Sequence, residues 1–127
     1  MSNRDHAAML LRLAHEDLSA LQGMADANIF SNGVFGFHAQ QAVEKSVKAW
    51  LALKGVQYPR IHDIAELVAL LQDNQIVLPE RFQVIVSFSD FAVQFRYESY
   101  EEYGSNLDRD QIIRVVKEFV AYVEDLK

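Results

Sequence analysis

Amide, basic and titratable side chains are crowded into one stretch that ends near the midpoint of this 127-residue chain. Gln41 and Lys45 are four residues apart, and Arg60, His62 and Asp63 fall within four consecutive positions. A glutamine amide can read the edge of a base, and lysine or arginine can bind phosphate. Backbone N–H groups at a helix start also attract anions. These residues therefore predict an anion or nucleotide site.

The same residues have a structural interpretation, which the sequence leaves open. Lys48 follows Glu44 by four positions and can form an ion pair with it on a solvated helix face. Asp63 can end a turn and stabilise the helix that follows, and His62 can bind a backbone carbonyl.

A further basic residue, Arg96, precedes Tyr97 in an acidic, tyrosine-rich segment. Arg96 can either reach back to His62 and complete an anion pocket or pair with nearby glutamates. The four histidines show no i,i+4 spacing and no accompanying carboxylate motif, so we expect no metal site and no cofactor.

Long apolar periodicities separated by short breaks predict an all-α protein. We expect an up-and-down helical bundle of about five helices in a single domain, residues 1–127. Ser2 or Asn3 and Asp108 are candidate N-caps, and Gly55 is a candidate C′ residue. The predicted helices span Arg4–Ala25, Phe35–Lys54, His62–Gln72, Pro79–Phe95 and Asp108–Leu126.

The predicted helix from Pro79 to Phe95 is apolar on two sides. With α-helical periodicity, one stripe contains Phe82, Val86 and Val93, and a nearly opposite stripe contains Val84, Phe88, Phe91 and Phe95. Such a helix is either central in the bundle or shared with a second subunit.

Composition narrows the function classes. The formal charge of −6 disfavours broad binding to RNA or DNA, which needs a basic surface. The chain contains no cysteine, and we find neither a signal peptide nor an apolar run of about 18 residues that could span a membrane. We therefore expect a cytoplasmic protein without membrane association.

Two segments resemble one protein family. His38-Ala-Gln-Gln-Ala-Val-Glu-Lys-Ser-Val-Lys-Ala, followed by Gly55 and Tyr58-Pro-Arg-Ile-His-Asp-Ile, is similar to the core of the HEPN (higher eukaryotes and prokaryotes nucleotide-binding) domain family. Arg96-Tyr97 with the following Tyr-Glu-Glu-Tyr resembles the family's later Arg-Tyr segment. The resemblance covers Arg4 to Leu126.

This resemblance implies an all-α bundle, often a homodimer, and frequent pairing with a minimal nucleotidyltransferase in a toxin–antitoxin-like module. It also implies one of two activities, non-catalytic nucleotide binding or metal-independent ribonuclease action. Ribonuclease members carry an Arg-x4–6-His motif, which is missing here. We therefore expect a nucleotide-binding or regulatory subunit whose ligand could be ATP. Its expected nucleotide-binding residues are Gln41, Lys45, Arg60, His62, Asp63, Arg96 and Tyr97. The alternative is a ribonuclease toxin with His62 and Arg96 as catalytic residues.

Overall fold

The computed structural model describes residues 2–26, 28–89 and 107–127, and this part of the chain contains five helices and no strand. The all-α fold predicted from the periodicity is confirmed. The elements are α1 (Asn3–Gly23), α2 (Asn32–Leu53), α3 (Ile64–Asp73), the 3-10 helix η1 (Glu80–Phe88) and α6 (Arg109–Glu124).

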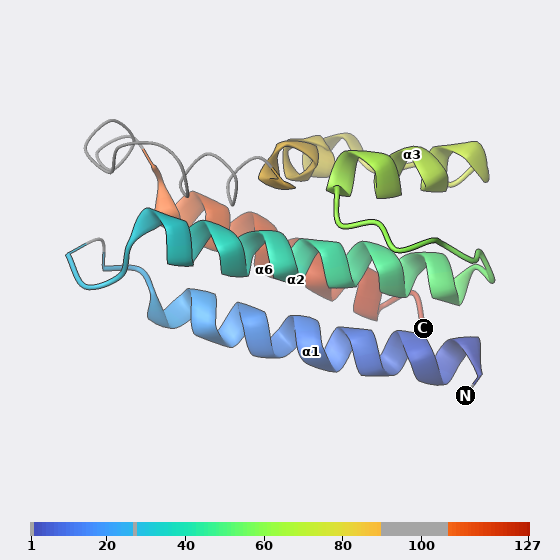
Figure 1. Ribbon diagram of the computed structural model, residues 1–127, viewed down its shortest axis with the longest axis horizontal. Helices are drawn as coiled ribbons and strands as arrows, with labels where there is room; N and C mark the ends of the chain where they lie inside the picture. Colours follow the sequence, from blue (N-terminus) through green and yellow to red (C-terminus); the bar gives the residue numbers. More distant parts are fainter. Residues whose placement is uncertain (1, 27, 90–106) are drawn as a thin grey trace.

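Three long helices form the body of the bundle (Figure 1). α2 lies between α1 on one side and the pair formed by α3 and η1 on the other, and α6 packs against both α1 and α2. α2 and α6 begin at the same end of the molecule and run in one direction, whereas α1 runs in the opposite direction. This arrangement leaves the polar side of α2 next to the connection that leads into α3.

Side-chain caps fix where the helices begin. Ser2 accepts from the backbone N–H of Asp5 and Asp108 accepts from that of Gln111, so both predicted N-caps are confirmed. α2 starts earlier than predicted, because Ser31 caps it by accepting from the N–H of Val34. At the other end of α2, Gly55 has a φ of 72°, the left-handed conformation expected of a C′ residue.

η1 corrects the prediction of an α-helix from Pro79 to Phe95. Three residues complete a turn of a 3-10 helix, so Phe82, Ile85 and Phe88 lie in one row, at most 1% exposed. Val84 is 50% exposed. The two predicted stripes were wrong here because they assumed a period of 3.6 residues, which separates Phe82 from Phe88. Phe91, Val93 and Phe95 lie outside the described residues.

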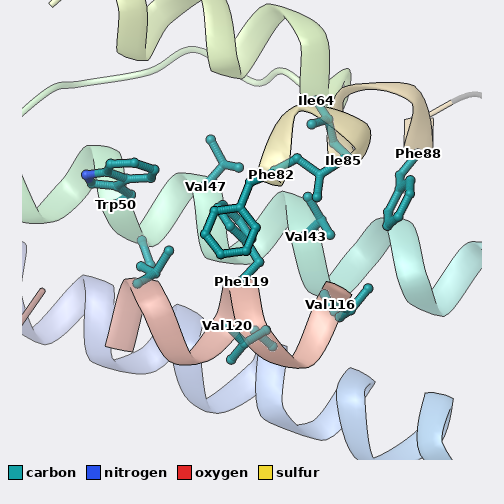
Figure 2. Close-up of a cluster of buried hydrophobic side chains, with 14 of the residues drawn as sticks. Val43, Val47, Trp50, Ile64, Phe82, Ile85, Phe88, Val116, Phe119 and Val120 are labelled. Carbon is teal, nitrogen blue, oxygen red and sulfur yellow. The ribbon is translucent and has the colours of Figure 1, made fainter. Parts of the chain in front are cut away.

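One part of the core fills the space between α2, α6 and η1 (Figure 2). The rings of Phe82 and Phe119 meet edge-on with centroids 5.1 Å apart, and the Tyr122 ring lies 5.4 Å from Phe82 and 5.5 Å from Trp50. Aromatic pairs of this geometry contribute about 0.5–1.5 kcal/mol beyond their buried area. They hold η1 against the bundle and thereby hold the end of η1 next to α3.

A buried arginine joins the starts of α2 and α6 to the end of α1. The Arg109 guanidinium donates to the carbonyl of Met24 at 2.7 Å, the carbonyl of Phe30 at 2.7 Å and the side-chain oxygen of Asn32 at 2.9 Å. It also lies 4.7 Å from the ring centroid of Phe35. The connection between α1 and α2 is therefore attached directly to α6.

Among the helices that the structure describes, none combines the length and the apolar character that crossing a membrane would require.

Candidate functional site on helix α2

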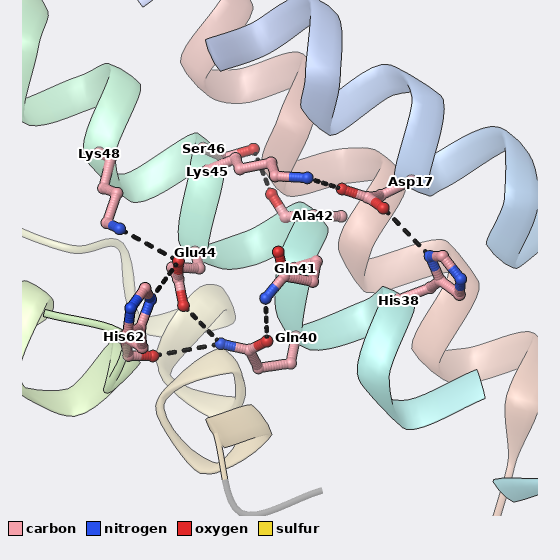
Figure 3. A network of polar contacts seen from close by, with 10 residues as sticks. All are labelled: Asp17, His38, Gln40, Gln41, Ala42, Glu44, Lys45, Ser46, Lys48 and His62. Carbon is pink, nitrogen blue, oxygen red and sulfur yellow. Dashed lines mark hydrogen bonds and ion pairs between the residues drawn. The ribbon is translucent and has the colours of Figure 1, made fainter. Parts of the chain in front are cut away.

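Glu44 is the centre of a polar network on α2 (Figure 3). Its side chain is only 5% exposed. One carboxylate oxygen accepts from the Lys48 ammonium at 3.1 Å and lies 3.2 Å from Nδ1 of His62, and the other accepts from the Gln40 amide at 2.7 Å. A buried carboxylate is costly unless charged and polar groups surround it, so these contacts are what allow Glu44 to be buried.

Gln40 connects α2 to the segment that precedes α3. Its amide nitrogen donates to Glu44 and, at 3.1 Å, to the backbone carbonyl of His62. Its amide oxygen accepts from the Gln41 amide at 2.8 Å. Because Gln40, Glu44 and Lys48 are spaced at four residues, they form one row along α2, and His62 is attached to that row through both its backbone and its ring.

His62 is held in place but remains open to solvent. Its side chain is 78% exposed, although its Nδ1 is bonded to the buried Glu44. A carboxylate acceptor fixes the proton on Nδ1 of a neutral imidazole, so Nε2 is left to meet a ligand or to accept a proton. Arg60, two positions earlier, is also exposed.

The start of α3 is already occupied by contacts from within the chain. The N–H of Ile64 donates to the hydroxyl of Ser89 at 2.6 Å, and the N–H of Ala65 donates to the carboxylate of Asp63 at 2.9 Å. Asp63 is thus the N-cap of α3, in line with the structural interpretation of this residue. An anion bound to these backbone groups would have to displace both side chains.

Lys45 belongs to a second polar cluster, on the side of α2 that faces α1. Its ammonium donates to Asp17 at 2.6 Å, and Nδ1 of His38 lies 3.1 Å from the other oxygen of the same carboxylate. Figure 3 shows Lys45 directed toward Asp17 and away from His62. The structure therefore brings Gln41 and His62 into one network but places Lys45 in another.

Two of the predicted site residues, Arg96 and Tyr97, lie outside the described residues. Within the part of the chain that the structure describes, no three His, Asp or Glu side chains are grouped so as to hold a metal ion.

Sequence reasoning missed the burial of Glu44. The sequence predicted the i,i+4 ion pair of Glu44 with Lys48 but placed it on a solvated helix face, whereas the Glu44 side chain is buried. The four-residue spacing along α2 indicates that Gln40, Glu44 and Lys48 share one face. The burial of Glu44 depends on the segment around His62, which lies 18 residues away in the chain and so could not be read from that spacing.

The fold and the site define this protein as a small α-helical domain. Its second helix carries a polar row that is attached to the turn at His62 and Asp63. The particular family follows from comparison with known proteins: the HEPN domain matches residues 7–126, and the chain belongs to this family. Neither the curated proteins nor the solved structures give a match. Membership supports a nucleotide-binding or ribonuclease-type domain.

Proposed function

We propose that this protein is a non-catalytic nucleotide-binding subunit that regulates a partner. The observation that carries the proposal is an exposed His62 held by a buried Glu44, with an exposed Arg60 two residues away. Phosphate groups of a nucleotide such as ATP would accept hydrogen bonds from the Arg60 guanidinium and from Nε2 of His62 once that nitrogen carries a proton.

The held conformation of His62 favours ligand binding. A side chain whose rotamer is already fixed loses less conformational entropy when a ligand arrives. Arginine can contact phosphate through two parallel N–H groups. The Gln41 amide, bonded to Gln40, is a proposed contact for a polar ligand edge. Arg96 and Tyr97 remain proposed contacts with the nucleotide. Lys45 would act indirectly through its ion pair with Asp17, and Asp63 would act by capping the start of α3.

We further propose a cytoplasmic homodimer that pairs with a minimal nucleotidyltransferase in a toxin–antitoxin-like module. Family membership supports this part of the proposal, which is tested by co-expression. A nucleotidyltransferase encoded beside this gene should co-purify with the chain, and light scattering should give the mass of a dimer for the chain alone. A monomer that retains no such partner would contradict it.

The nucleotide site itself is tested by isothermal titration calorimetry with ATP. Arg60→Ala and His62→Ala should each weaken binding about tenfold, which corresponds to the loss of one charge-assisted hydrogen bond. Arg114→Ala is the matched control, because Arg114 is an exposed cation on α6. The proposal fails if ATP and the other common nucleotides give no binding heat, or if the control loses as much affinity as the site variants.

One observation favours the alternative, a metal-independent ribonuclease. A histidine oriented at Nδ1 by a carboxylate is the arrangement that many enzymes use for general acid–base catalysis, and the Glu44–His62 pair has it. Arg60 would then stabilise charge on the scissile phosphate. RNA cleavage that persists in EDTA, is abolished by His62→Ala and is reduced by Glu44→Gln would establish this activity in place of simple binding.

A further inference from the structure

A hollow of about 430 Å³ lies where the start of α1 meets the end of α2 and the segment that follows it. It is lined by Asn3, His6, Ala52, Val56, Gln57 and Tyr58. Neither the sequence motifs nor the network around Glu44 assigns a role to this hollow. Its lining combines two aromatic rings, two primary amides and two small or branched apolar side chains.

The aromatic wall of the hollow is already ordered. Nε2 of His6 lies 2.8 Å from the Tyr58 hydroxyl, and the two rings are stacked with an interplanar angle of 23° and centroids 6.2 Å apart. Burial raises the pKa of Tyr58, and the negative charge of Glu44 raises it further, so the hydroxyl stays protonated at neutral pH. The hydroxyl can therefore donate to a neutral His6, and this bond fixes both rings before any ligand binds.

The chemistry of the lining fits a flat, polar-edged ring. A planar heterocycle can stack on an imidazole or phenol face, a contact that does not depend on which base is bound. The amides of Asn3 and Gln57 each offer a donor and an acceptor, which matches the mixed donor and acceptor edge of a nucleobase. Ala52 and Val56 supply apolar surface.

The hollow lies farther along α2 than the site around His62. Ala52 is the next position in the four-residue row that contains Glu44 and Lys48, and it lies about 12 Å from Glu44 along the helix axis. The Lys48 ammonium is 3.1 Å from Glu44 and 5.7 Å from the centroid of the Tyr58 ring. Lys48 therefore lies between the two places, where it can attract the negative charge of a ligand that spans them.

We propose that this hollow is the base subsite of the nucleotide whose phosphates contact Arg60 and His62. The inference rests on the proposed nucleotide-binding function and adds the location of the base. The base lies against the ring of His6 or Tyr58 with its edge toward the amides of Asn3 and Gln57. The phosphates extend past Lys48 toward His62.

Three probes separate the base subsite from the phosphate contacts: adenosine, ATP and inorganic tripolyphosphate. Binding is measured by chemical-shift titration of the labelled, full-length chain. His6→Ala should weaken adenosine and ATP about tenfold, as expected for the loss of a stacking face, and leave tripolyphosphate unchanged. Arg60→Ala should weaken ATP and tripolyphosphate but not adenosine.

Two further variants control for folding and position. Gln57→Ala changes an exposed side chain and should weaken adenosine without affecting the fold. His15→Ala removes a different histidine of α1, one whose side chain is 52% exposed. This variant should bind all three probes as tightly as the unmodified chain.

The outcomes separate the two proposals. ATP binding that depends on Arg60 but is unaffected by both His6→Ala and Gln57→Ala would overturn the base subsite and leave the nucleotide-binding function intact. Adenosine binding that both variants weaken would support the subsite. If none of the three probes shifts any resonance, both proposals fail.

Discussion

Replacing Arg109 by alanine should be among the most damaging single substitutions in this protein. The residue is 6% exposed, and its guanidinium donates to the carbonyls of Met24 and Phe30 and to the side chain of Asn32. Alanine would leave these acceptors without the guanidinium donor, and two of the three contacts are buried. It would also remove the contact of the cation with the ring of Phe35.

The size of the effect follows from those contacts. A buried acceptor left without its donor costs about 1–3 kcal/mol. Three acceptors share one guanidinium, so their costs are not additive, and the favourable removal of a buried charge offsets part of them. We expect Arg109→Ala to lower the free energy of unfolding by about 3–5 kcal/mol, a large part of the roughly 5–15 kcal/mol typical of a domain.

Urea unfolding followed by far-UV circular dichroism measures this loss. Arg114→Ala removes an exposed arginine from the same helix and should change stability by less than about 0.5 kcal/mol. Arg109→Lys keeps the charge but not the planar fork, so it should recover only part of the loss. A loss below about 1 kcal/mol for Arg109→Ala would show that the guanidinium is not what holds the α1–α2 connection to α6.

Three further substitutions test local features. Gly55→Ala should destabilise by about 1 kcal/mol in thermal unfolding, because its φ of 72° strains any residue with a Cβ. Burial and the charge of Glu44 raise the pKa of Tyr58 in the folded protein. The contribution of the Tyr58 hydroxyl to stability should therefore be complete below pH 10 and be lost as the pH rises through the higher folded-state pKa. Tyr58→Phe should abolish this share of the stability loss at alkaline pH. Hydrogen bonding to Lys127 lowers the pKa of Glu124. The contribution of the Glu124 carboxylate to stability is therefore present above pH 4.5 and disappears as the pH falls through the lower folded-state pKa. Glu124→Gln should flatten the acid side of the plot of stability against pH.

Local signals allowed most of the helix boundaries to be predicted. Ser2, Asp108 and Gly55 act within a few residues of their own positions, so their capping roles can be read from short windows of sequence. The same holds for the Glu44–Lys48 ion pair, which needs only one turn of helix.

Contacts between distant residues could not be predicted in this way. Lys45 is bound to Asp17, 28 positions earlier, and Arg109 reaches Met24 across 85 positions. No periodicity within a helix encodes which residue of another helix lies opposite. For that reason the sequence grouped Lys45 with His62 in one candidate site, whereas the structure directs Lys45 toward Asp17, and Arg109 was not singled out at all.

The hydrogen-bonding type of a helix was also not visible in the sequence. Phe82, Ile85 and Phe88 fit a three-residue period, but Phe82 and Val86 fit an α-helical one equally well. Packing of η1 against α6 and α3 decides between the two, and it is a property of the assembled bundle.

The three-residue turn of η1 restricts how the length of this segment can change. Each residue advances the helix by about 120°, so one inserted residue would turn every side chain after it by a third of a circle. Phe88 would leave the core, and the hydroxyl of Ser89 would no longer meet the first N–H of α3. An insertion or deletion of three residues would instead preserve the direction of every side chain. Related sequences that keep η1 are therefore expected to differ in length here by whole turns, whereas ordinary surface loops vary one residue at a time.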